Sequence, residues 1–128
     1  MTFNDRSIRC RDCVTTFTFS ADEQRVSRGD LMNFETFNFD PSIMAGVRAI
    51  GYATPTPIQL KAIPPILQGR DVIGLAQTGT GKTAAFALPI LQRLLHSQRG
   101  QVGAVIISPT RELTEQTWEP FSELGQKT

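Results

Sequence analysis

The most informative segment of this chain is Ala76-Gln77-Thr78-Gly79-Thr80-Gly81-Lys82-Thr83. It follows a short apolar run and opens a helix pattern, which is the context in which a G-x-x-x-x-G-K-[S/T] match carries weight. Glycines let such a backbone curl until its N–H groups point at phosphate oxygens, and the helix N-terminus adds partial positive charge. Lys82 would reach the β and γ phosphates, and the Thr83 hydroxyl would ligate Mg²⁺. The segment predicts a nucleoside-triphosphate-binding loop, with Ala76 in place of the first glycine; a plain turn is the alternative.

The segments around this loop alternate between strand and helix patterns. Val72-Ile73-Gly74-Leu75-Ala76 is short, apolar and bounded by turn residues, as a buried parallel strand should be, and residues 102–107 repeat the pattern. Helix patterns run from Gly81 to about Leu95 and from Arg111 to about Leu124. This order predicts an α/β fold with a parallel sheet, in which 72–76 and 102–107 are strands.

Two shorter helices are expected upstream of the loop. The dipeptides Asp40-Pro41 and Thr56-Pro57 each place an N-cap residue before a proline at the first helical position. The first helix should end at Gly51, which can adopt the left-handed conformation that ends helices. Pro64-Pro65 should interrupt or kink the second helix, because proline removes an internal hydrogen bond.

Composition and charge limit the classes of protein to consider. The chain has 128 residues, enough for one domain, or one with a small appendage. Its 40% hydrophobic content is that of a globular protein, and its net charge of +1 gives no overall basic footprint for nucleic acid. Two cysteines exclude a disulfide scaffold. The longest apolar run, Ala84–Leu91, is too short to cross a bilayer, so we expect no membrane partner and a cytoplasmic location.

Two further segments could complete a nucleotide and polynucleotide site. Gly51-Tyr52-Ala53-Thr54-Pro55-Thr56-Pro57-Ile58-Gln59 places a glutamine amide upstream of the loop, and an amide offers a donor and an acceptor to the edge of adenine. Pro109-Thr110-Arg111-Glu112-Leu113-Thr114-Glu115-Gln116 begins where the second strand should end, and starts a helix whose N–H groups suit a phosphate. By chemistry alone, a solvated Gln59 and a plain Thr110 helix cap remain the alternatives.

Together these three segments resemble the DEAD-box family of ATP-dependent RNA helicases, and specifically its bacterial RhlE-like group. Residues 51–59 look like the family's Q motif, residues 76–83 like its motif I, and residues 109–116 like its motif Ia. Phe34 stands where the family carries an isolated upstream aromatic residue. The resemblance covers residues 32–128, and it implies that they are the N-terminal portion of an incomplete RecA-like P-loop NTPase domain.

The resemblance also implies a set of site residues. Gln59 would recognise adenine, Phe34 would stack near the base, and residues 77–83 would wrap the phosphates. Residues 109–111 would touch the RNA backbone without reading its sequence. ATP and Mg²⁺ are the implied cofactors, with Thr83 as the magnesium ligand. The implied nucleotide residues are Phe34, Tyr52, Thr54, Gln59, Gln77, Thr78, Gly79, Thr80, Gly81, Lys82, Thr83 and Ala84, and the implied RNA residues are Pro109, Thr110 and Arg111.

Several family features do not follow Gln116. The Gly-Gly segment, the Asp-Glu-Ala-Asp box, the Ser-Ala-Thr motif and the second RecA-like domain are missing, and hydrolysis needs a carboxylate to hold Mg²⁺ and orient water. We therefore expect a truncated helicase fragment that is inactive alone. It should bind ATP, and RNA is the only further ligand expected. The alternative is a non-catalytic nucleotide- or RNA-binding product with a zinc-ribbon-like head. Exposed edges of a two-stranded sheet should favour self-association.

The first 31 residues differ in character from the rest. They are polar and rich in Arg and Thr, with one alternating stretch at 14–19 that could form a short strand, so we place a domain boundary between segments 1–31 and 32–128. Cys10-Arg11-Asp12-Cys13 has the C-x-x-C spacing of a zinc knuckle, and residues 4–24 resemble half of a bacterial zinc-ribbon module. Zinc requires four ligands and a second cysteine pair is missing, so we expect Cys10 and Cys13 to be two reduced thiols without metal; a zinc ion that these cysteines share with a second chain is the alternative.

Overall fold

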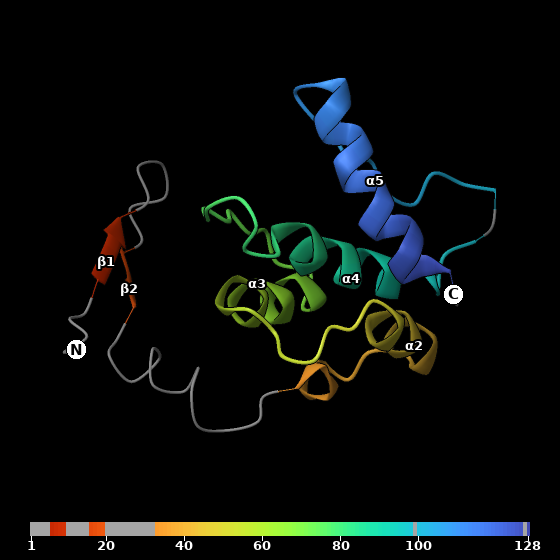
Figure 1. Cartoon of the computed structure of the whole chain (residues 1–128), viewed down its shortest axis with the longest axis horizontal. Helices are drawn as coiled ribbons and strands as arrows, with labels where there is room; N and C mark the ends of the chain where they lie inside the picture. The colour runs from red at the N-terminus through yellow and green to blue at the C-terminus, as the bar shows by residue number, and fades with distance from the viewer. Residues whose placement is uncertain (1–5, 10–15, 20–32, 99, 127) are drawn as a thin grey trace. The chain divides into compact units, whose positions relative to one another are not determined.

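The computed structural model describes residues 6–9, 16–19, 33–98, 100–126 and 128. The chain divides into two compact units, Met1–Leu31 and Met32–Thr128. The elements follow the order β1, β2, η1, α2, α3, α4, α5 (Figure 1). Within the described ranges, no helix has the length and apolar character needed to span a membrane.

The described part of the first unit is a pair of antiparallel strands. β1 spans Arg6–Arg9 and β2 spans Thr16–Phe19, with Arg6 opposite Phe19. β2 confirms a strand within the alternating Thr/Phe stretch. The predicted zinc ligands, Cys10 and Cys13, lie outside the described residues.

The described part of the second unit is helical. Its elements are η1, a 3-10 helix at Phe34–Phe37, and the α-helices α2 (Pro41–Ala49), α3 (Pro57–Leu67), α4 (Lys82–Leu94) and α5 (Arg111–Gly125). The proline-based helix starts are confirmed, since Pro41 and Pro57 are each the first helical residue. The Asp40 side chain caps α2 by accepting a hydrogen bond of 2.9 Å from the backbone N–H of Ser42.

The prolines within α3 do not end it. The helix continues through Pro64 and Pro65 to Leu67, so of the two predicted outcomes, an interruption or a kink, the interruption does not occur. The two prolines lack the N–H groups that would bond to the preceding turn. Burial of Ala62 and Ile63 against the other helices offsets that loss.

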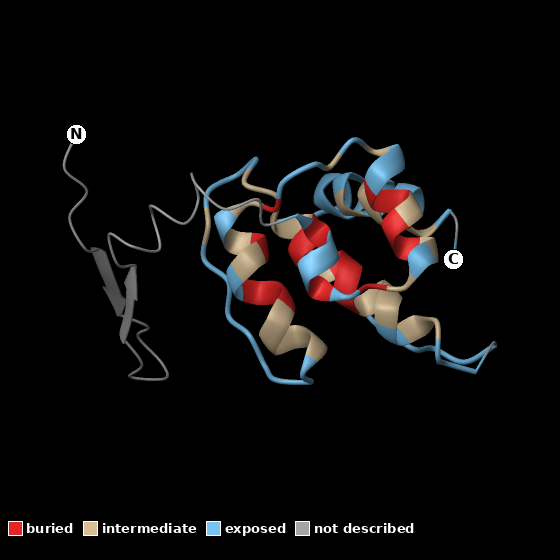
Figure 2. Ribbon diagram, turned by 90° about the horizontal axis from the view of Figure 1, so that it is seen from below, coloured by how far each residue is buried: buried red, intermediate tan, exposed pale blue. Residues whose placement is uncertain are grey.

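The core lies where the helices face one another (Figure 2). Ile43 of α2, Ile63 of α3, Leu88 of α4 and Leu124 of α5 are each 0% exposed. The helices α2 and α5 approach each other at Gly46, where a Cβ atom would overlap the carbonyl oxygen of Leu124. The sequence positions that pack this core therefore span nearly the whole second unit.

The predicted parallel sheet is wrong. Neither 72–76 nor 102–107 is a strand, and between residues 33 and 128 the described ranges contain no strand at all. A strand exists only through hydrogen bonds to a neighbouring strand, and neither segment has such a neighbour in the described part of the chain. Their apolar side chains are left exposed, with Leu75 at 77% and Ile107 at 91%.

Candidate nucleotide-binding site

The phosphate-binding segment forms the loop that precedes α4. Gly79 and Gly81 have φ angles of +78° and +83°, in the left-handed region that side chains with a Cβ rarely adopt. Gly81 is the N-cap of α4, and Lys82 and Thr83 are its first two residues. The first N–H groups of a helix have no acceptor within it, so this end of α4 offers donors and partial positive charge to an anion.

The side chain of Lys82 folds back over the loop. Its ammonium donates hydrogen bonds to the carbonyl oxygens of Ala76 and Gln77, the latter at 2.7 Å. The Thr80 hydroxyl also donates to the Gln77 carbonyl, at 2.8 Å. Among the described residues, no carboxylate forms a salt bridge with Lys82. Its charge is therefore balanced only by carbonyl dipoles, which an anionic ligand can replace.

The side chain of Gln59 joins the start of α3 to this loop. It is 3% exposed; its Oε1 accepts a hydrogen bond of 2.9 Å from the Thr56 backbone, and its Nε2 donates one of 3.1 Å to the Gly81 carbonyl. A Cβ at Gly81 would lie 2.5 Å from that Nε2, so only glycine allows this approach. The amide still has a second N–H and a second acceptor lone pair for another partner.

Thr56 is a residue of this contact that the sequence reasoning treated only as a helix cap. Its Oγ1 is buried, lies at the capping position opposite Gln59 and makes no hydrogen bond. The spacing T-x-x-Q from Thr56 to Gln59 is the signal that could have revealed the link, since it is the capping-box pattern.

Phe34 is part of the helical core. It is 2% exposed, stacks on Tyr52 with ring centroids 6.0 Å apart, and meets the edge of Phe37 at the same separation. Tyr52 is half-buried and Thr54 is exposed. The ring of Phe34 is therefore enclosed by protein rather than open to a base.

The predicted RNA segment forms the start of α5. The Thr110 hydroxyl caps this helix by accepting a hydrogen bond of 3.2 Å from the Leu113 N–H. The side chain of Arg111 is 89% exposed, and its Nε lies 3.6 Å from a carboxylate oxygen of Glu115. Such an exposed pair is weak, so the guanidinium can exchange partners. No hydrogen bond in the described part of the chain joins residues 109–111 to the loop.

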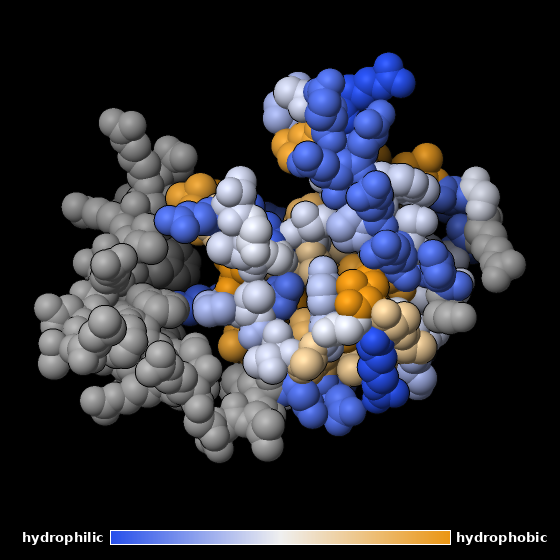
Figure 3. Space-filling model, in the orientation of Figure 1, coloured by the Kyte–Doolittle hydropathy of each residue, from blue (hydrophilic) through white to orange (hydrophobic). Residues whose placement is uncertain are grey.

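The rest of α5 is acidic. The helix contains one arginine and four glutamates, all exposed, and hydrophilic residues gather over it in the space-filling view (Figure 3). The glutamates are Glu112, Glu115, Glu119 and Glu123. A polyanion would be repelled by this stripe, so any phosphate contact is confined to the first turn.

Magnesium has one candidate ligand here. Thr83, the expected magnesium ligand, is the second residue of α4 and is half-buried. Among the described residues, no group of three His, Cys, Asp or Glu side chains could hold a metal ion. The remaining Mg²⁺ ligands would be phosphate oxygens and water, which is usual for this ion.

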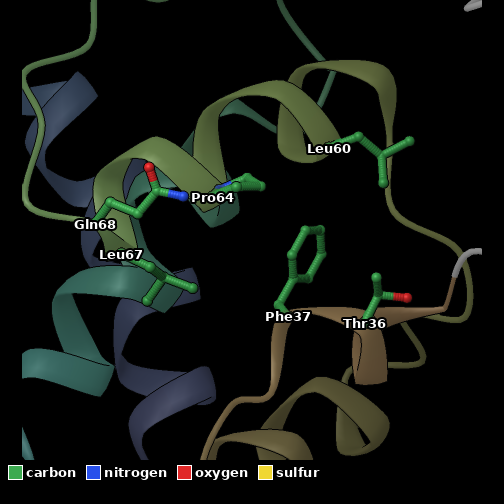
Figure 4. A pocket seen from close by; sticks show the side chains of 6 residues that line it. All are labelled: Thr36, Phe37, Leu60, Pro64, Leu67 and Gln68. Atoms are coloured by element: carbon green, nitrogen blue, oxygen red, sulfur yellow. The ribbon is translucent and has the colours of Figure 1, made fainter.

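A separate cavity of about 380 Å³ opens between η1 and α3 (Figure 4). It is largely apolar, and the ring of Phe37 projects toward α3. Its lining residues are Thr36, Phe37, Leu60, Pro64, Leu67 and Gln68. None of them belongs to the predicted nucleotide or RNA sets.

Comparison with known proteins identifies the family. Residues 56–128, more than half of the chain, match the model of the DEAD/DEAH box helicase family. This protein therefore belongs to the DEAD/DEAH box helicases, and DEAD-box helicases bind ATP.

Curated relatives and solved structures agree with this assignment. The chain is 54% identical over 93 residues to the ATP-dependent rRNA helicase RRP3 of Saccharomyces cerevisiae strain S288c, covering 73% of this chain and 18% of that protein. It is 50% identical over 96 residues to the ATP-dependent RNA helicase DBP10 of Candida albicans, covering 75% of this chain and 11% of that protein. The chain thus spans less than a fifth of either relative.

Two solved structures show the same relationship in three dimensions. The RNA helicase Prp28 from Chaetomium thermophilum, bound to ADP, has a TM-score of 0.68 and 41% identity, covering 74% of this chain and 24% of that one. The L327V variant of S. cerevisiae Dbp5, bound to RNA and ADP BeF3, has a TM-score of 0.71 and 36% identity, covering 75% of this chain and 25% of that one. These neighbours are RecA-like helicases, although the described part of this chain lacks a parallel sheet.

Proposed function

We propose that this chain binds ATP with Mg²⁺ through residues 77–83, as the nucleotide-binding portion of a DEAD-box RNA helicase. The observation that carries the proposal is the Lys82 ammonium, which lies over the loop on two carbonyl oxygens and has no carboxylate partner in the described part of the chain. Phosphate oxygens are stronger acceptors for a cation than neutral carbonyls. Incoming β and γ phosphates would therefore exchange with Ala76 and Gln77 as partners of Lys82.

Each part of the loop then has a task toward the phosphates. The left-handed Gly79 and Gly81 shape the backbone, and the first N–H groups of α4 complete the anion cradle. The Thr83 hydroxyl would hold Mg²⁺ between itself and the phosphate oxygens. The bound ion would neutralise phosphate charge and fix the geometry of the triphosphate.

Adenine recognition is proposed for the Q-motif residues. Gln59 is held in place by Thr56 and by the Gly81 carbonyl, and it has one N–H and one lone pair left. Those two groups match the donor and acceptor on one edge of adenine. The ring of Phe34 is enclosed and stacks on Tyr52, so Phe34 would contribute by holding the Tyr52 ring in position.

RNA binding is proposed for the first turn of α5 alone. Pro109, Thr110 and the exposed guanidinium of Arg111 would contact the phosphate backbone, as phosphate contacts position a strand without reading it. The acidic stripe further along α5 opposes a longer contact. We expect the binding to be weak and to fall steeply as salt is raised.

Hydrolysis is not proposed for this chain. The described residues supply Lys82 and Thr83 but no carboxylate cluster that could hold a metal and orient an attacking water. The alternative is that the chain is a non-catalytic nucleotide- or RNA-binding product, and this alternative also involves no hydrolysis. The cytoplasmic location, the truncation, the RhlE-like subgroup and the zinc-ribbon resemblance stay predictions.

Fluorescent ATP and GTP analogues test the proposal directly. We expect the ATP analogue to bind more tightly than the GTP analogue, and Lys82→Ala to weaken ATP binding about tenfold or more, because a charge-assisted bond to phosphate is lost. Arg93→Ala, which removes an exposed cation from the last turn of α4, is the matched control and should leave binding unchanged. Equal binding of both nucleotides would contradict the role of Gln59. RNA-stimulated phosphate release that Lys82→Ala abolishes would contradict the absence of catalysis.

A further inference from the structure

We draw no further inference here: the strongest candidate, the largely apolar cavity of about 380 Å³ between η1 and α3, carries none because nothing in the structure shows what covers it.

Discussion

The helical core and the two exposed segments, residues 72–76 and 102–107, contain the same kinds of apolar side chain. These side chains are buried in the core and exposed to solvent in the two segments. Ile63 and Leu88 are 0% exposed in the core, whereas Ile107 and Leu75 are 91% and 77% exposed. The difference lies in the neighbours and not in the residues themselves. Helices satisfy their own backbone and need only one apolar face covered, while a strand needs a partner for its backbone as well. Apolar character alone therefore does not determine burial.

The largest expected effect comes from truncating matched side chains in the two regions. Leu88→Ala should lower the free energy of unfolding by about 2–5 kcal/mol, because it removes buried methyl groups and leaves a cavity. Val105→Ala removes methyl groups that are already in water, and should change the free energy by less than about 0.5 kcal/mol.

Urea unfolding followed by far-UV circular dichroism at low micromolar concentration measures both variants. Similar losses in the two would show that Val105 is buried in solution. That result would mean that the segment from Val102 to Ile107 already has a partner under dilute conditions, and the contrast between the two regions would disappear.

A smaller effect is expected where two helices touch. A Cβ added at Gly46 would overlap the Leu124 carbonyl, so Gly46→Ala should destabilise the chain by about 1–3 kcal/mol through overpacking. Helix propensity favours alanine over glycine by about 1 kcal/mol, so a stabilised variant would show that α5 does not press on α2. Gly74→Ala is the control, since its Cβ would make an ordinary contact of 3.8 Å with Ile58. The thermal unfolding midpoints of both variants show whether each substitution stabilises or destabilises the chain.

The helical part of the fold follows from local signals in the sequence. An N-cap before a proline set the starts of α2 and α3, and Gly81 and Thr110 cap α4 and α5. These signals are local because a helix closes its hydrogen bonds within its own segment. Whether residues 72–76 and 102–107 form a sheet could not be decided in the same way, because strand pairing depends on residues far away in the chain.

In the candidate site, too, local interactions could be predicted from the sequence and long-range contacts could not. The loop could be predicted, because its glycines and Lys82 act within a few residues of one another. The contact of Gln59 with the Gly81 carbonyl spans 22 residues, and the enclosure of Phe34 by Tyr52 depends on how the helices pack. The spacing of the motifs identified Gln59 and Phe34 as candidate site residues. It did not show that Gln59 already bonds to the Gly81 carbonyl or that the ring of Phe34 already packs on Tyr52.

The smallest expected effect is a pH dependence at the start of α2. The Asp40 carboxylate accepts hydrogen bonds from the Ser42 hydroxyl, at 2.6 Å, and from the Ser42 N–H, and these lower its pKa below the usual 3.8. A lowered pKa means that the cap stabilises the fold above pH 3.8 and that this contribution is lost as the pH falls through the lower value. Asp40→Asn keeps a capping side chain without the titration, so its stability should depend less on pH in this range. Ser42→Ala removes the stronger cause and should give an intermediate profile. Urea midpoints measured from pH 5 to pH 3 compare the three chains, and identical slopes would show that the titration of Asp40 does not contribute to the acid stability.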